Sequence, residues 1–340
     1  QGRIAAQPSS APPLHQTLAH LRSMAIAAQA ACWYPQPVAS GAIFVPVAPS
    51  MQVQGVLASR PQPAALAAPR PLEPGPVAQP RCLAAPSSLL ASLSQVIANG
   101  VNKDTLIAQH ALELSHDREG CQLVQQALDD AQSDEARLAI AGTLRGHVWE
   151  VARCPHANHV LQRIIVSIKP SECQFVIDEI SARSDGGVLT LARHKYAYRV
   201  VQRLLEQLHQ WQVAPLVDRL ADDCVALSTQ RFGTFIVQHA LEYGSEGQQS
   251  RIIRQLAGNV SQFSRNNDAC MVLDKALTEG VECSKAALAR AILDCEGALA
   301  DMAHTRRGHV ASISLLQLLD VGDLARAGRQ LAAREYSLRG

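Results

Sequence analysis

Gly120-Cys121-Gln122-Leu123-Val124-Gln125 is the first copy of a motif made of a small residue, a variable pair, two aliphatic residues and a polar residue. The later copies are Ala157-Asn158-His159-Val160-Leu161-Gln162, Ala197-Tyr198-Arg199-Val200-Val201-Gln202, Gly233-Thr234-Phe235-Ile236-Val237-Gln238, Ala269-Cys270-Met271-Val272-Leu273-Asp274 and Gly308-His309-Val310-Ala311-Ser312-Ile313. Their first variable residues lie 37, 40, 36, 36 and 39 residues apart. A period in this range indicates stacked supersecondary units.

The apolar residues around the motif recur with helical spacing. Seven positions before the first variable residue stand Leu114, Val151, Leu191, Leu227, Phe263 and Met302, and seven positions after it stand Leu128, Ile165, Leu205, Leu241, Leu277 and Leu316. Upstream runs such as 135–152 and 248–264 are also helical in pattern, with short polar turns at His156, Asn266 and Thr305. Each unit is therefore expected to hold two or three helices and to bury its apolar face against its neighbours, as in an all-α solenoid. The small residue that precedes the variable pair suggests a close backbone approach at the start of the helix.

Composition divides the chain near residue 87. Fifteen of the 18 prolines lie before this point, together with only six charged residues. We expect residues 1–87 to be a disordered extension rich in Ala, Pro and Gln, and residues 88–340 to form the helical repeat domain. Because the chain begins with Gln rather than Met, we also expect it to be a fragment of a longer protein.

Several classes of protein are not indicated. The nine cysteines form no CxxC pair and no Cys/His metal spacing, so they are expected to be free thiols in a reducing compartment. No Walker loop, HExxH, GxSxG or dinucleotide-binding glycine pattern occurs, and neither a secretory signal nor a membrane-spanning stretch is present. The sequence predicts a protein that is not an enzyme, needs no cofactor and binds no metal.

The charge balance does not by itself indicate a nucleic-acid partner. From residue 87 onward there are 26 Lys or Arg and 29 Asp or Glu, whereas nucleic-acid binders usually have a basic surface. Eight basic residues do lie within or beside the motif, namely Arg153, Arg163, Arg193, Lys195, Arg199, Arg203, Arg231 and Lys275. Such clustering is consistent with a basic face, although a run of charges is more often only a solvated surface.

The motif places three side chains together if it starts a helix. The polar residue lies one turn beyond the first variable residue, and the second variable residue lies beside them. Gln can donate and accept hydrogen bonds at a base edge, and His159, Arg199 and Phe235 offer planar faces for a stacked base, worth ~1–3 kcal/mol for an aromatic ring. A single exposed Gln needs no such explanation, but four in one frame favour a functional row. Ordinary packing is the alternative role for four of the variable residues, Cys121, Cys270, Tyr198 and Phe235.

These motifs resemble the repeats of the Pumilio (PUF) family of single-stranded RNA-binding proteins. The resemblance covers about residues 100–320 and is carried best by 157–163, 198–203 and 232–242. It implies a right-handed α-solenoid of about six Pumilio-like repeats that form a crescent, in the order of the third to eighth repeats of the family. The first two would lie within residues 83–102 or be absent.

The resemblance also implies a site on the concave surface, where RNA lies antiparallel to the repeats. In the family, Asn with Gln reads uracil, Cys or Ser with Gln reads adenine, and Ser with Glu reads guanine. The RNA-binding residues carried over are Cys121, Gln122 and Gln125; Asn158, His159 and Gln162; Tyr198, Arg199 and Gln202; Thr234, Phe235 and Gln238; and Cys270, Met271 and Asp274.

Several copies depart from the family pattern. Gln122 is a weak stacker, Tyr198 replaces the usual small residue, and Thr234 stands where Asn is usual. Asp274 is one methylene shorter than the guanine-reading Glu. The sixth motif, with His309, Val310 and Ile313, should read no base. The expected RNA has a UGUA-like core followed by UA, with weaker selection at its 5′ end.

Two other functions remain open at this stage. An armadillo- or HEAT-like scaffold would bind extended peptides and suits the near-neutral charge, and a degenerate member would bind RNA by shape and charge alone or serve as a scaffold. For the leading hypothesis we expect messenger RNA 3′ untranslated regions as ligands, effector proteins on the convex face or on the extension, and a cytoplasmic location.

Overall fold

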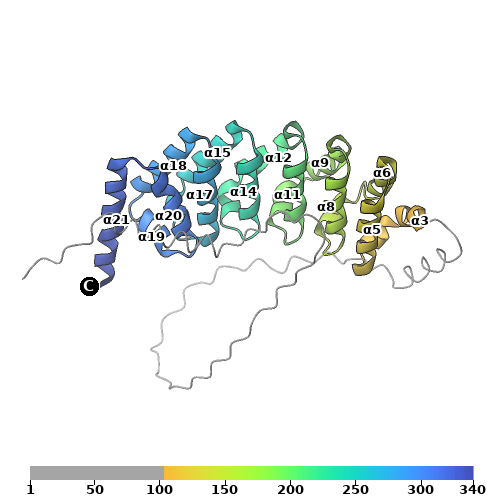
Figure 1. The fold of residues 1–340 in the computed structure, drawn as a ribbon, viewed down its shortest axis with the longest axis horizontal. Coiled ribbons are helices and arrows are strands. Elements are labelled where there is room, and N and C mark those ends of the chain that lie inside the picture. Colours follow the sequence, from red (N-terminus) through yellow and green to blue (C-terminus); the bar gives the residue numbers. More distant parts are fainter. Residues whose placement is uncertain (1–102, 340) are drawn as a thin grey trace, which may run out of the picture.

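The computed structural model describes residues 103–339, and the side chains of residues 105–333. The predicted extension, residues 1–87, and the stretch 83–102 proposed for further repeats lie outside these residues. All regular structure in the described range is helical, and the helices stand side by side in one long stack (Figure 1). The prediction of an all-helical repeat domain is confirmed.

Each repeat consists of a short helix, a helix that carries the motif and a second-row helix. The short helices are α4 (Ala111–Ser115), α7 (Val148–Arg153), α10 (Val188–Arg193), α13 (Cys224–Ser228), α16 (Val260–Phe263) and α19 (Ala298–His304). The motif helices are α5 (Arg118–Asp130), α8 (Ala157–Ser167), α11 (Ala197–Gln207), α14 (Gly233–Tyr243), α17 (Asn267–Glu279) and α20 (Gly308–Leu318). The second-row helices are α6 (Asp134–Thr143), α9 (Gln174–Ser181), α12 (Gln210–Asp222), α15 (Glu246–Ala257), α18 (Glu282–Asp294) and α21 (Val321–Arg339). Helix α3 (Lys103–Gln109) precedes the first repeat, and the 3₁₀ helix η1 (Pro170–Cys173) precedes α9.

The stack is held together by contacts between neighbouring repeats. Each motif helix packs against the next one along the whole series from α5 to α20, and α9, α12, α15 and α18 pack in the same order in the second row (Figure 1). The two apolar positions that recur seven residues from the variable pair are buried in every repeat, except that Leu316 is half-buried. Each repeat thus covers the apolar face of its neighbour, as the periodic pattern predicts.

The small residue before the variable pair marks a close approach between the short helix and the motif helix. A Cβ added at Gly120 would lie 2.4 Å from the carbonyl oxygen of Leu114, and one at Gly233 would lie 2.6 Å from that of Leu227. Such distances are shorter than van der Waals contact, so a side chain at either position would push the two helices apart. The expectation of a close backbone approach is confirmed for these copies.

The helical runs upstream of the motif are each divided in two, which differs from the uninterrupted runs 135–152 and 248–264 that the sequence suggested. The first run breaks between α6 and α7, where Gly146 adopts φ 82°, a left-handed conformation that glycine reaches at little cost. The second breaks at Gly258 and Asn259, between α15 and α16. The breaks turn the chain from one repeat into the next and give each repeat its third helix.

Candidate nucleic-acid interface

The motif residues lie where the helical geometry predicts, one turn apart on each motif helix. In α8 the side-chain amide of Gln162 donates a hydrogen bond of 2.8 Å to Oδ1 of Asn158, so the two side chains are in direct contact. His159 lies beside them and is exposed. Asn158, His159 and Gln162 therefore form the predicted trio on one face of α8.

The first variable residues are more buried than a surface row would require. Cys121, Asn158, Tyr198, Thr234 and Cys270 are at most 8% exposed, because their side chains turn into the seam with the preceding turn or the next repeat. Asn158 donates to the carbonyl oxygens of Cys154 (2.7 Å) and Pro155 (3.0 Å), and the Thr234 hydroxyl donates to that of Asp268 in the next repeat (2.8 Å). These residues therefore also fix the repeat geometry.

The four glutamines split into two groups by exposure. Gln125 and Gln162 are half-buried, whereas Gln202 and Gln238 are 8% and 7% exposed. The amide groups of Gln125 and Gln238 donate to the backbone carbonyl oxygens of Cys121 (3.0 Å) and Thr234 (3.1 Å), four residues earlier. Each of these bonds uses one N–H of the amide and leaves its carbonyl oxygen as an acceptor.

The second variable residues provide the faces that stacking requires at three repeats. His159 and Arg199 are exposed, and desolvation by the surrounding protein atoms, followed by the charges of His156 and Arg199, lowers the pKa of His159. The Arg199 guanidinium lies 5.1 Å from the centre of the Tyr198 ring. Phe235 is half-buried, while Gln122 is exposed and Met271 is half-buried against Arg307.

Tyr198 belongs to an aromatic cluster rather than to an open reading position. Its ring stacks on Phe232 with a centroid distance of 5.2 Å and on Phe235 with one of 5.7 Å. The alternative of inter-repeat packing is therefore the one that the structure supports for Tyr198. Tyr198 occupies the place next to Gln202 that a small residue would leave open to a base.

Asp274 has lost part of its acceptor capacity to the neighbouring repeat. The hydroxyl of Ser314 on α20 donates to Oδ1 of Asp274 at 2.6 Å, a contact that sequence reasoning missed. Burial raises the pKa of the Asp274 carboxyl, which hydrogen bonding to Ser314 and the nearby Lys275 only partly offset. In the sixth repeat, His309, Val310 and Ile313 are half-buried and offer no comparable pair of polar groups.

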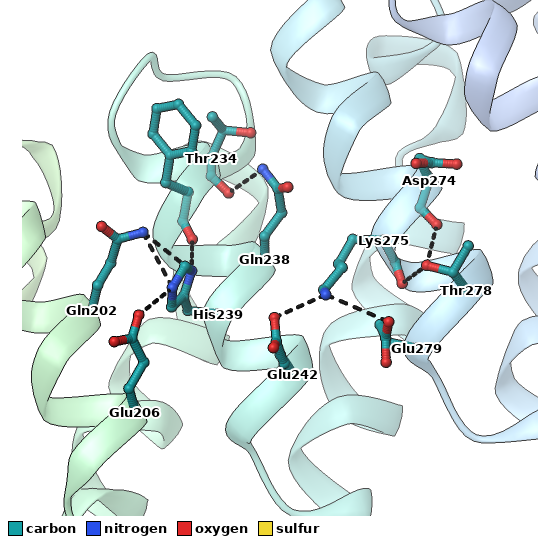
Figure 2. A network of polar contacts seen from close by, with 11 residues as sticks. Gln202, Glu206, Thr234, Gln238, His239, Glu242, Asp274, Lys275, Thr278 and Glu279 are labelled. Atoms are coloured by element: carbon teal, nitrogen blue, oxygen red, sulfur yellow. Dashed lines mark hydrogen bonds and ion pairs between the residues drawn. The ribbon is translucent and has the colours of Figure 1, made fainter. Parts of the chain in front are cut away.

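A ladder of polar contacts joins neighbouring motif helices (Figure 2). The fifth residue after the first variable residue of one repeat contacts the residue eight positions after that of the preceding repeat, in the pairs Arg163–Asp129, His239–Glu206 and Lys275–Glu242. Figure 2 shows the last two pairs. The His239 and Lys275 contacts measure 2.9 and 2.8 Å. Arg203 has Val166 at that place in the preceding repeat, and it pairs with Glu206 of its own helix instead. The regular five-and-eight offset was present in the sequence and could have revealed this ladder.

The eight basic residues that the sequence placed near the motif fall into two groups, those paired with a carboxylate and those that are not. Carboxylates neutralise Arg163, Arg193, Arg203 and Lys275. Within residues 105–333, no carboxylate forms an ion pair with Arg153, Lys195, Arg199 or Arg231, and each of these four lies over an aromatic ring. Only four of the eight basic residues expected on this face therefore keep a positive charge that no carboxylate of the described range neutralises.

Two further functional classes find no support in the described part of the chain. No group of three His, Cys, Asp or Glu side chains among residues 105–333 is placed to hold a metal ion. The helices between residues 103 and 339 include none with the length and hydropathy of a membrane span. The seven cysteines in this range are free thiols, as predicted for them.

His194 makes the stability of the central repeats sensitive to acid. Its Nδ1 accepts hydrogen bonds from the backbone N–H groups of Tyr196 and Ala197, both at 3.3 Å, at the start of α11. Burial, and then the charges of Arg153 and Lys195, lower its pKa from 6.5 to about 4. Between these two values the unfolded chain binds more protons than the folded chain, so stability is expected to fall as the pH decreases through this window.

His194→Asn keeps an acceptor at this turn and removes the titration. Its free energy of unfolding should decline less than that of the parent in urea titrations across this window, and equal declines would contradict the assignment.

The comparisons with known proteins agree with this architecture. A family model described as the Pumilio-family RNA binding repeat matches residues 110–141, 147–181, 187–221 and 223–257. Each matched segment spans the short helix, the motif helix and most or all of the second-row helix of one of the first four repeats. The fifth and sixth repeats have the same three helices but lie outside the matched residues, where Asp274 and the sixth motif depart from the repeated pattern.

Curated relatives align over only part of their length. A Pumilio domain-containing protein of Schizosaccharomyces pombe is 25% identical over 130 residues, which are 38% of this chain and 18% of that protein. The Pumilio homology domain family member 4 of Saccharomyces cerevisiae is 28% identical over 102 residues, 30% of this chain and 11% of that protein. The matched region thus spans less than a fifth of these relatives.

Solved structures of similar fold carry RNA. PUF-8 in complex with PBE-RNA superposes with a TM-score of 0.63 at 21% identity, over 68% of each chain. The Puf3 RNA binding domain bound to a Cox17 RNA 3′ UTR recognition sequence gives a TM-score of 0.59 at 20% identity, over 72% of this chain and 67% of that one. At these identities the likeness establishes the fold. The four matched segments within residues 110–257 are repeats of the Pumilio family of RNA-binding repeat proteins, which is not a family of enzymes.

Proposed function

We propose that this protein binds single-stranded RNA along its motif helices and selects it by base identity. The observation that carries the proposal is the trio in α8, where Gln162 contacts Asn158 beside the exposed ring of His159. Such a trio combines a hydrogen-bonding edge with a stacking face, which is how proteins read unpaired bases. The structures bound to 3′ UTR RNA support the same chemistry here, and messenger RNA regulation is the corresponding role.

The repeats are expected to contribute unequally. Asn158 and Gln162 would read uracil, and Cys121 with Gln125 would read adenine. Gln238 with Phe235 would favour uracil more weakly, since Thr234 stands where the family usually has Asn. The α11 repeat should tolerate several bases because the Tyr198 ring fills its reading position. The favoured RNA is therefore UGUA-like with a downstream UA. Effector proteins would bind on the second-row side or on the extension, and the protein would act in the cytoplasm.

The test is fluorescence-anisotropy binding of the full chain to a short RNA that contains UGUAUA. A scrambled RNA of equal composition and a series of salt concentrations serve as controls. We expect at least about tenfold preference for the first RNA, because each mismatched base costs roughly 1–3 kcal/mol in base-edge readout. Equal binding of the two RNAs would contradict base selection.

A protein-binding scaffold is the second candidate, and one observation favours it. Ion pairs, two of them in the ladder, neutralise four of the eight basic residues near the motif, which leaves less attraction for phosphates than the sequence suggested. Absence of RNA binding at low salt would support this candidate, since electrostatic attraction to RNA is strongest there.

The guanine position provides a gain-of-function prediction. Asp274→Glu extends the carboxylate by one methylene past Ser314, which holds Oδ1 of Asp274 at 2.6 Å in the parent. We expect the preference for G at the matching position to rise about fivefold to tenfold, toward the discrimination of a good two-bond contact. Competition with RNAs that differ only at this base measures the change. Asp274→Asn is the control because it lacks the second acceptor, and an equal preference in both variants would show that this repeat reads no base.

A further inference from the structure

The three central repeats carry a cation in or next to the turn that leads into the motif helix. Arg153 ends α7, Lys195 lies between α10 and α11, and Arg231 lies between α13 and α14. These three residues are called the basic edge below. None of them belongs to the trios, so base reading leaves them without a role.

Each cation of the basic edge is held by an aromatic ring instead of a carboxylate. Arg153 lies 5.5 Å from the centre of the Trp149 ring, Lys195 lies 4.6 Å from that of Tyr196, and Arg231 lies 5.5 Å from that of Phe232. Stacking on a ring orients a cation without neutralising it and leaves N–H donors available. Lys195 and Arg231 are exposed, and Arg153 is half-buried.

A carboxylate on which this edge acts is already paired with another cation. The charge of Arg153 acts on Asp185, but Asp185 forms its ion pair with Arg183 at 2.8 Å. Nε of Arg153 has no hydrogen-bond partner among the described residues. The positive charge of the edge is therefore not balanced within residues 105–333.

Arg153 and Lys195 lie close to one another, and stacked rings link Arg231 to the central repeat. Burial is the main cause of the lowered pKa of His194, and the charges of Arg153 and Lys195 lower it further. On the other side, Phe232 beneath Arg231 stacks on Tyr198 at 5.2 Å, and Tyr198 in turn lies under Arg199. The cations thus follow one another across three consecutive repeats.

The motif helices of the three central repeats begin without acidic residues. The first turns of α8, α11 and α14 contain no acidic residue, whereas those of α5 and α17 contain Glu119 and Asp268. The carboxylates of the ladder lie eight residues beyond the first variable residue, about 12 Å along the helix at 1.5 Å per residue. The motif helices of the centre are therefore positive where they begin and neutral or acidic farther on.

We propose that Arg153, Lys195 and Arg231 form a phosphate-binding edge that carries the backbone of single-stranded RNA past the start of the motif helices. This inference rests on the proposed RNA binding and adds the path of the strand, with the bases toward the trios. Guanidinium and ammonium groups are suited to phosphate because they are charged donors that need no particular base.

The test compares the salt dependence of binding in the full chain. Each neutralised phosphate contact in single-stranded nucleic acid contributes about 0.7 to the slope of log K against log salt concentration. The triple variant Arg153→Gln, Lys195→Gln, Arg231→Gln is expected to lower this slope by about 2, while the ratio of affinities for the UGUAUA and scrambled RNAs stays within about twofold of the parent ratio. The control Arg251→Gln removes a charge that is paired with Asp218 and Asp222 on the second row, and its slope should equal that of the parent.

Conservative and single variants keep the test decisive if the triple variant is unstable. Lys195→Gln alone changes an exposed residue and should lower the slope by about 0.7, and the exchange Arg153→Lys, Lys195→Arg, Arg231→Lys should retain it. An unchanged slope with intact base preference would overturn the phosphate edge and leave the proposed function standing. A loss of base preference without a change in slope would also overturn it, since the residues would then act on bases. If the parent chain binds no RNA, both proposals fail together.

Discussion

Replacing both Gln125 and Gln162 with alanine is expected to weaken binding to the UGUAUA-containing RNA by at least about 30-fold. A lost base contact typically costs roughly 1–3 kcal/mol, and the costs add when the positions are well separated. The two residues belong to different repeats, α5 and α8, and are the two half-buried glutamines of the series. A combined loss of about 2 kcal/mol or more corresponds to this factor.

The structure indicates that the double variant will still fold. The Gln125 amide bonds only the Cys121 carbonyl of its own helix, and the Gln162 amide bonds only Asn158. Alanine is a better helix former than glutamine, which offsets part of the loss of these contacts. A melting temperature close to that of the parent is therefore expected.

The matched control is the pair Gln210→Ala and Gln249→Ala on α12 and α15 of the second row. This variant removes the same chemical groups from the second-row helices, where Gln210 is exposed and the Gln249 amide donates to the carbonyl oxygen of Gly244 at 3.2 Å. Anisotropy titrations of both double variants with the same RNA make the comparison. If the two variants lost affinity equally, the trios would have no special part in binding.

The second large effect is expected in the core. Phe263→Ala should lower the free energy of unfolding by about 3–5 kcal/mol, the usual cost of emptying a fully buried aromatic site. Phe263 ends α16 with 0% exposure, at the position that five other repeats fill with Leu114, Val151, Leu191, Leu227 and Met302. Urea denaturation followed by circular dichroism measures the change.

Phe263→Leu is the informative companion variant. It places at this position the residue that three other repeats already use, so it should cost less than about 1.5 kcal/mol. Val321→Ala controls for the loss of an apolar side chain at the surface, because Val321 is 85% exposed. A loss for Phe263→Ala no larger than that for Val321→Ala would mean that α16 contributes little to the stack.

The period and the motif determined most of the fold in advance. Apolar residues at fixed distances from the variable pair must share one helix face, and these residues are the ones that pack between repeats. The sequence left two or three helices per unit open, and the positions of the breaks were not predicted, because they depend on local backbone geometry, such as the left-handed Gly146, rather than on the apolar pattern. Both breaks fall in runs whose composition is helical on either side.

The candidate site was predicted less completely than the fold. Helical geometry correctly placed Gln162 against Asn158, since these residues lie in one helix. The burial of Tyr198 depends on Phe232, 34 positions later, and the restraint on Asp274 depends on Ser314, 40 positions later. Contacts between repeats determine how exposed the side chains of each trio are. A motif considered alone contains no information about the repeat that packs against it. The ladder is the exception, because its offset repeats along the chain.

Among the described residues, the packing contacts lie within a repeat or join it to the repeat before it or after it. A chain of this kind has a low contact order, so it can begin to fold at any stable repeat and extend from there. During synthesis, each new repeat can dock on its predecessor as soon as its three helices have left the ribosome. Under a force applied to its two ends, the same protein should come apart in several steps rather than in one cooperative event.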